Sequence, residues 1–158
     1  MRFTNTLTAV LGINSMATAG FVKADFYISN VAGTQLERLN SYRNQHQLTP
    51  EQDKVLDQAA EIVRTADHSQ IGIIRAATEA AFGNAEAAYI LTGKHRGSEN
   101  TFAEKRALLR RATDCNCSTD DNYCNDSQYC AYNYGNCNFK PGCGTLWLEV
   151  CDGRCVKK

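Results

Sequence analysis

The first 114 residues contain no cysteine, although the whole chain has eight. The chain also has no excess charge of either sign, with 17 Lys and Arg residues against 17 Asp and Glu residues. Nucleic-acid binding through bulk positive charge is therefore not expected. No apolar run reaches about 18 residues, so no transmembrane segment is expected. Hydrophobic residues still make up 43% of the chain, which is typical of a folded protein and too many for a wholly disordered one.

The cysteines lie together at the C-terminal end, among many Asn, Asp, Gly and Ser residues. A segment this short buries too little apolar surface to fold without cross-links. Four disulfides would stabilise it by about 2–4 kcal/mol each, and the sequence cannot choose among the roughly 105 possible pairings. The cysteines predicted to form disulfides are Cys115, Cys117, Cys124, Cys130, Cys137, Cys143, Cys151 and Cys155.

Zinc binding is the alternative use of these cysteines, because eight thiolates could hold two tetrahedral ions. However, the segment has no paired C-x2-C knuckles and no histidine. We therefore predict disulfides, with no metal or other cofactor. Because disulfides persist in oxidising compartments, this is also a prediction of a secreted protein.

Residues 1–24 have the features of a signal peptide. Arg2 supplies a positive charge, residues 7–13 form a short apolar run, and residues 17–19 read Ala-Thr-Ala, which fits a cleavage site. Ala24 is a second possible end of the signal peptide. The alternative is a disordered or strand-like N-terminal tail.

Residues 25–112 are predicted to form a small antiparallel helical bundle, described here as a leader-like region. The clearest helix start is the sequence TPEQ at residues 49–52, which combines a capping box with proline at the first helical position. An apolar stripe at helical spacing then runs over residues 55–66. Further helices are predicted to start at Thr34, Ser69, Asn84 and Thr101, with helix ends before Gly83 and at Gly93. The fold class is thus a small all-α region followed, at residues 113–158, by a disulfide-rich module with little regular secondary structure.

Arg110 and Arg111 end the last predicted helix just before the module. A dibasic pair at a domain boundary is a candidate processing site, and cleavage there would release the module. Arginines in a last helical turn also complement the helix dipole. The sequence leaves both interpretations open.

No set of residues points to catalysis. His46, His68 and His95 are far apart in helix-end or loop contexts, where they are expected to be exposed, and no catalytic motif is present. The acidic residues at positions 120, 121 and 126 lack the pattern of a calcium loop, so a solvated loop is expected. We predict no catalytic residues and no enzyme activity.

Aromatic residues are concentrated in the module. A disulfide scaffold has little interior, so several rings should lie on its surface, where rigid aromatic groups can recognise a partner. Alternatively, two or three rings form a miniature core against the disulfides. The candidate recognition surface is Tyr129, Tyr132, Tyr134, Phe139 and Trp147. Among these, Trp147 is expected to be the most buried or the most involved in binding.

Several short segments resemble the fulvocin C-related bacteriocins. They are CNCST at residues 115–119, DNYC at 121–124, Tyr129-Cys130, Cys137, PGCGTLW at 141–147, CDGRC at 151–155 and LTPEQ at 48–52. The resemblance implies a bacterial secreted protein in which an eight-cysteine module follows a signal sequence and a helical leader-like region, with no established catalytic residues.

We therefore expect a secreted bacteriocin-like, antibacterial protein or precursor. Its module would recognise a target on the surface of a competing bacterium, without catalysis. The alternative is a secreted disulfide-rich binding or structural protein that keeps both parts and does not kill.

Overall fold

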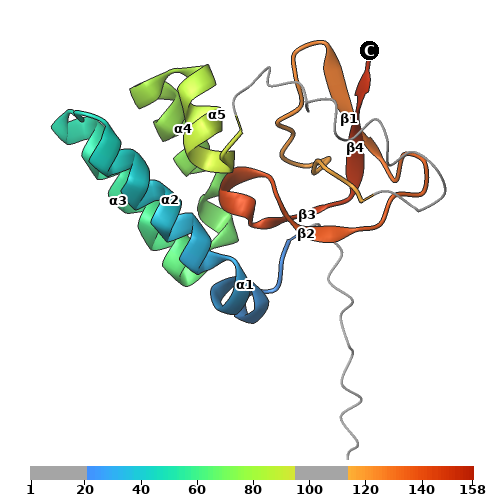
Figure 1. The fold of residues 1–158 in the computed structure, drawn as a ribbon, viewed down its shortest axis with the longest axis horizontal. Helices are drawn as coiled ribbons and strands as arrows, with labels where there is room; N and C mark the ends of the chain where they lie inside the picture. Colours follow the sequence, from blue (N-terminus) through green and yellow to red (C-terminus); the bar gives the residue numbers. More distant parts are fainter. Residues whose placement is uncertain (1–20, 95–113) are drawn as a thin grey trace, which may run out of the picture.

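The computed structural model describes residues 21–94 and 114–158. In these ranges a bundle of helices lies beside a module of short strands (Figure 1). The helices are α1 (Ala24–Asn30), α2 (Ala32–Gln45), α3 (Pro50–Thr65), α4 (Ile71–Phe82) and α5 (Asn84–Thr92). The strands are β1 (Gln128–Tyr132), β2 (Lys140–Cys143), β3 (Glu149–Cys151) and β4 (Gly153–Lys157). This confirms the predicted fold class of a helical region followed by a disulfide-rich module.

Helix α3 starts as the sequence predicts. The Thr49 side chain accepts a hydrogen bond from the Gln52 backbone N–H at 3.2 Å, and the Gln52 side chain accepts one from the Thr49 N–H at 3.1 Å. This reciprocal pair is a capping box, and Pro50 occupies the first helical position, which needs no N–H donor. The apolar stripe that follows is buried at Leu56 and Val63.

The start of α2 differs from the prediction. The helix begins at Ala32, so Thr34 lies inside it, and the N-cap residue Val31 makes no side-chain capping bond. The reason is that α1, which the sequence did not indicate, ends at Asn30 and only Val31 separates the two helices.

The start of α4 also shifts, from Ser69 to Ile71. Ser69 lies in a short 3-10 turn that precedes α4, and the carboxylate of Asp67 caps this turn by accepting from the Ser69 N–H at 3.0 Å. Asn84 is the first residue of α5, with Gly83 as the N-cap. The predicted helix ends at Gly83 and Gly93 are confirmed.

Both the backbone conformation at Gly93 and the close approach of the Arg38 side chain favour glycine at this position. Its φ of +73° lies in the left-handed region that favours glycine. A Cβ added there would lie 2.8 Å from Nη1 of Arg38. Gly93 therefore lets the Arg38 guanidinium approach the C-terminal end of α5, where its Nη2 donates to the Leu91 carbonyl at 3.1 Å.

The module contains two antiparallel pairs of strands, β1 with β4 and β2 with β3. In the first pair Cys130 lies opposite Cys155 and Tyr132 lies opposite Gly153. Figure 1 places this β1–β4 ribbon on the side of the molecule remote from α2 and α3. Among the helices of the described ranges, none combines the length and apolar character needed to cross a bilayer.

The main hydrophobic core includes residues from both parts of the chain. Leu146 and Leu148 of the module are fully buried in the same cluster as Tyr27, Leu56 and Ile74 of the helices. The module has a second, separate cluster made only of cysteines, namely Cys115, Cys137, Cys143 and Cys151. The two fully buried leucines of the module therefore lie in the core of the helical bundle rather than in a core of the module itself.

Candidate functional site: the disulfide module and its junction with the helices

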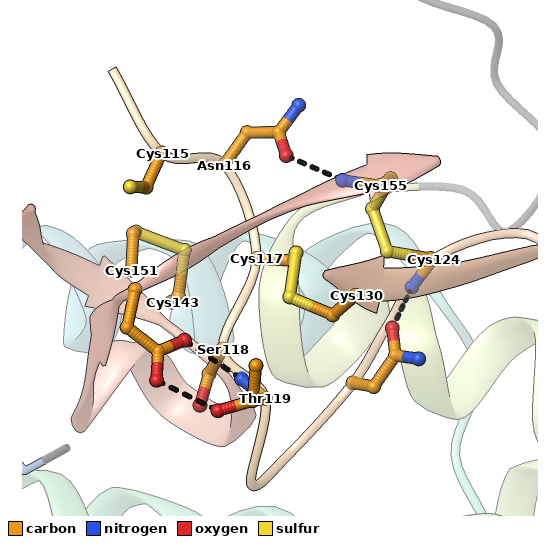
Figure 2. The surroundings of a disulfide bond; sticks show 12 residues. Cys115, Asn116, Cys117, Ser118, Thr119, Cys124, Cys130, Cys143, Cys151 and Cys155 are labelled. Carbon is orange, nitrogen blue, oxygen red and sulfur yellow. Dashed lines mark hydrogen bonds between the residues drawn. A yellow bond between two sulfur atoms is a disulfide. The ribbon is translucent and has the colours of Figure 1, made fainter. Parts of the chain in front are cut away.

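All eight cysteines of the module are paired, as predicted, and Figure 2 shows the Cys117–Cys130, Cys124–Cys155 and Cys143–Cys151 disulfides. The pairs are Cys115–Cys137, Cys117–Cys130, Cys124–Cys155 and Cys143–Cys151. The sulfurs of Cys117, Cys124 and Cys130 lie within 4.8 Å of one another. Each of them belongs to a disulfide, so this cluster is two neighbouring cross-links and not a set of thiolates for zinc.

Two of the disulfides fasten a loop to the β1–β4 ribbon. Cys130 and Cys155 face each other across the two strands, but they bond to Cys117 and Cys124 respectively. Backbone bonds strengthen the same attachment, since the Gly153 N–H donates to the Cys117 carbonyl at 3.1 Å. The loop between Cys117 and Cys124 is therefore held at both ends, and this loop carries Asp121, which faces the helices.

Side-chain hydrogen bonds complete this framework (Figure 2). The carboxylate of Asp152 accepts from the Thr119 backbone N–H at 2.9 Å and from the Thr119 hydroxyl at 2.7 Å. The side-chain oxygen of Asn116 accepts from the Cys155 N–H at 3.0 Å. In these bonds, short polar side chains next to cysteines satisfy backbone N–H groups of the module.

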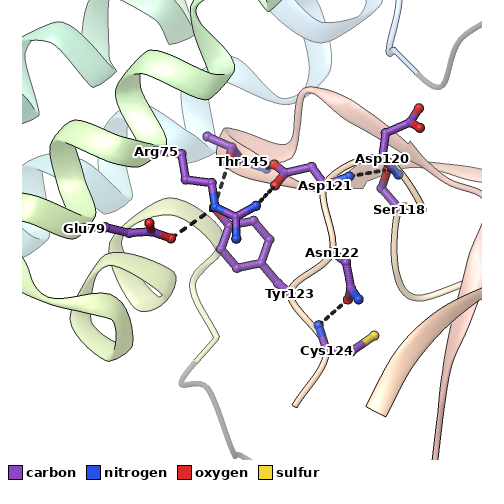
Figure 3. A network of polar contacts seen from close by, with 9 residues as sticks. All are labelled: Arg75, Glu79, Ser118, Asp120, Asp121, Asn122, Tyr123, Cys124 and Thr145. Carbon is purple, nitrogen blue, oxygen red and sulfur yellow. Dashed lines mark hydrogen bonds and ion pairs between the residues drawn. The ribbon is translucent and has the colours of Figure 1, made fainter. Parts of the chain in front are cut away.

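A polar network connects the module to α4 (Figure 3). Arg75 binds Glu79 on its own helix at 3.1 Å and Asp121 of the module at 2.6 Å. The second oxygen of Asp121 accepts from the Thr145 backbone N–H at 2.5 Å. The guanidinium also lies over the Tyr123 ring, 4.9 Å from its centroid. Asp121 thus joins three segments of the chain.

The expectation of a solvated acidic loop is wrong for Asp121, which is only 5% exposed. Its neighbour Asp120 and the nearby Asp126 are exposed, as expected. The difference arises because the partner of Asp121 is Arg75, which lies 46 residues earlier in the chain, and no local pattern reveals such a contact.

A second junction consists of the 3-10 turn Thr145–Trp147 and the residue after it. The Tyr27 hydroxyl donates to the Leu146 carbonyl at 2.6 Å, and the Val22 N–H donates to the Leu148 carbonyl at 2.9 Å. Both Leu146 and Trp147 have positive φ, at 54° and 59°. This conformation costs free energy for residues other than glycine, so the surrounding contacts must hold the turn in place.

Trp147 belongs to this junction. Its indole N–H donates to the Thr92 carbonyl at 2.9 Å, and Arg38 lies over its ring at 5.5 Å. The ring is half-buried, whereas the flanking Leu146 and Leu148 are fully buried. The structure therefore places Trp147 against the helices, apart from the other aromatic residues of the candidate recognition surface.

Glu149 lies buried beside the junction, with 3% of its surface exposed. Ser118 hydrogen-bonds to its carboxylate, but the oxygen Oε2 has no hydrogen-bond partner. The pKa of Glu149 is raised to about 7, mainly by burial; the nearby charges of Asp121, Asp120 and Asp152 contribute to this rise, and the Ser118 hydrogen bond opposes it. A buried carboxyl group with this pKa is neutral in weak acid and charged above neutral pH.

The space around this carboxyl group depends on Gly144. Its φ is +69°, and a Cβ there would lie 2.8 Å from Oε2 of Glu149. Any other residue would need to displace the carboxyl group as well as adopt a left-handed conformation. The sequence analysis did not identify Glu149 or Gly144, because their importance depends on a close contact in the folded chain that no local sequence pattern indicates.

The remaining aromatic residues of the candidate recognition surface are exposed. Tyr132, Tyr134 and Phe139 are 66%, 55% and 48% exposed, and the rings of Tyr132 and Phe139 contact each other with centroids 5.6 Å apart. Tyr129 is also exposed, at 48%. Because it precedes Tyr132 by three positions on β1, its side chain leaves the opposite face of the strand. The five predicted residues thus lie in three locations. Trp147 packs against the helices, Tyr129 lies on one face of β1, and the other three are exposed at residues 132–139.

The histidines and arginines singled out in the sequence do not form a site within the described residues. His46 is exposed and stacks on Tyr42, while His68 is half-buried and stacks on Phe21, with ring centroids 4.0 Å and 4.6 Å apart. Burial lowers the pKa of His68. The predicted helix at Thr101, His95 and the candidate processing site Arg110-Arg111 lie outside the described residues.

The N-terminal boundary of the described residues bears on the predicted signal peptide. Phe21 forms an isolated bridge with Glu149, and Val22 is buried in the main core. Cleavage after Ala24 would remove both contacts, whereas cleavage after Ala19 would keep them. The Ala-Thr-Ala sequence at residues 17–19 lies outside the described residues.

Comparison of the chain with protein-family models, with curated proteins and with solved structures gives no significant match. The four disulfides are compatible with an extracellular protein. The resemblance to the fulvocin C-related bacteriocins stays a prediction.

Proposed function

We propose that the chain is an exported recognition protein that keeps both of its parts. In this proposal the disulfide module binds a target on a cell surface, and the helical bundle is the base that holds the module. The activity is binding without catalysis. The observation that carries the proposal is the exposure of Tyr132, Tyr134 and Phe139 on a disulfide-linked loop.

The packing of the module against the helices supports retention of both parts. Leu146 and Leu148 complete the helical core, and Asp121 is paired with Arg75 at 2.6 Å. A module released at Arg111 would expose both leucines to water and would leave the Asp121 carboxylate without its cation. Both changes disfavour release.

Binding to intact cells tests this proposal. The oxidised, full-length protein carrying a fluorescent label should bind cells of at least one bacterial species in a broad panel. The same protein, reduced and alkylated, should not bind, because the loop loses its cross-links. No binding across the panel, or equal binding by the reduced protein, would contradict the proposal.

A second candidate function is the antibacterial one that the resemblance implies. It is favoured by the way the helices cover Leu146 and Leu148, since a leader that masks an apolar surface keeps a toxic module inactive until cleavage. Growth inhibition by the oxidised module alone, and not by the uncleaved chain, would support it. Inactivity of both forms against every strain that the protein binds would eliminate it.

A further inference from the structure

The loop at residues 132–139, called here the aromatic loop, connects β1 to β2 and has a restricted composition. It contains three aromatic residues, three asparagines, one glycine and one cysteine, and residues 127–139 include no charged side chain. All residues of the loop except Cys137 are exposed. The composition therefore offers flat ring faces and amide groups, with no charge and no aliphatic side chain.

The aromatic loop is held rigidly although its side chains are exposed. Cys137 at its centre is bonded to the buried Cys115. The Asn133 N–H donates to the Asp152 carbonyl at 2.7 Å, and the Asn138 carbonyl accepts from the Cys115 N–H at 2.9 Å. The rings are thus presented without being used for the core, and little conformational entropy remains to be lost on binding.

We propose that the aromatic loop binds a neutral glycan. This inference rests on the proposed recognition function and names its ligand class. A sugar ring has a face of C–H groups, which can stack on Tyr132 or Phe139, and a rim of hydroxyl groups, which both donate and accept hydrogen bonds. The exposed side-chain amides of Asn133 and Asn136 likewise provide donors and acceptors.

Other ligand classes fit the aromatic loop less well. A nucleic acid or an anionic polymer needs unpaired cations beside the rings. Residues 127–139 have no cation, and Lys140, which follows Phe139, is paired with Asp114 at 3.3 Å. A protein partner typically needs an interface of about 20–30 residues on each side, and the loop spans residues 132–139 only. One or two sugar units match both its size and its neutrality.

The test measures binding of the oxidised, full-length protein to insoluble cellulose, chitin and cross-linked dextran, and to an array of neutral oligosaccharides. We expect binding to at least one of these probes, with less than a twofold change in about 0.5 M sodium chloride, because no charge pairing is involved. Tyr132→Ala and Phe139→Ala should each weaken that binding about tenfold or more.

Tyr129→Ala is the matched control, because Tyr129 has similar exposure but leaves the opposite face of β1. It should keep the binding within about twofold of the unchanged protein. Peptide mapping without reduction that recovers the same four disulfide pairs in every variant excludes exchanged pairing as the cause of a loss.

Three outcomes would overturn the inference: no binding to any of these probes, binding that Tyr132→Ala and Phe139→Ala leave unchanged, or binding abolished by salt. Binding to cells tests the wider proposal separately. If Tyr132→Ala and Phe139→Ala abolish binding to cells but no polysaccharide is bound, the target is a protein or another surface molecule. In that case only the glycan assignment fails.

Discussion

Replacing Glu149 by glutamine should change how the stability of the protein depends on pH. The pKa of this carboxyl group rises from 4.5 to about 7 in the folded protein, mainly because it is buried. Its contribution to stability is therefore complete below pH 4.5 and is lost as the pH rises to about 7. Each pH unit between these values lowers the free energy of unfolding by about 1.4 kcal/mol. The free energy of unfolding is therefore about 3 kcal/mol lower at pH 8 than at pH 4.5 because of this group.

Glu149→Gln removes this titration while keeping the shape of the side chain. The free energy of unfolding, measured by urea denaturation with the disulfides intact, should differ little between the variant and the unchanged protein at pH 4.5. At pH 8 the variant should be more stable by about 2–3 kcal/mol. Glu37→Gln, which removes a charge from an exposed position of α2, should show no comparable gain. Equal stability of Glu149→Gln and the unchanged protein at pH 8 would refute the assignment of a buried carboxyl group with a raised pKa.

Four other predictions follow from the contacts described above. Asp121→Ala should lower the free energy of unfolding by about 2 kcal/mol, because Arg75 loses its cross-module partner; a loss below about 0.5 kcal/mol would contradict this. Tyr27→Phe should lower the free energy of unfolding by about 1 kcal/mol, because the hydrogen bond to the Leu146 carbonyl is lost. A lower melting temperature would show this effect, and an unchanged melting temperature would contradict it. Peptide mapping without reduction should recover the pairs Cys115–Cys137, Cys117–Cys130, Cys124–Cys155 and Cys143–Cys151, and any exchanged pair would contradict this pairing. The intact mass of the secreted protein should correspond to a chain that begins after Ala19. A mass for a chain that begins after Ala24 would contradict the contacts of Phe21 and Val22 with the rest of the fold.

Local features of the fold could be predicted from the sequence. The capping box at Thr49 and the helix end at Gly93 depend on residues within a few positions of each other, and the structure confirms both. The apolar stripe of α3 is similarly a local periodic signal. The presence of disulfides could be predicted as well, because eight cysteines lie in one short segment, but their pairing could not.

Contacts between distant segments could not be predicted. Asp121 looked like a solvated acid because its partner Arg75 lies on another element. Trp147 was expected to be the most buried or the most involved in binding among the five aromatic residues, and it is the most buried. Its partner, the Thr92 carbonyl, lies 55 residues earlier and could not be predicted. The division of the aromatic residues among three places likewise depends on strand register and on the burial of one turn by the helices.

The central claim of this account is that the helices and the module form one folded unit without a disulfide between them, since no cysteine precedes Cys115. The most direct test inserts a specific protease site between Arg111 and Asp114, cleaves the folded, oxidised protein there, and measures the size of the product in native buffer. We predict that the two fragments stay together and separate only in denaturant, because Leu146, Leu148 and the Arg75–Asp121 pair hold them. Elution of a free, intact module in native buffer would contradict the account.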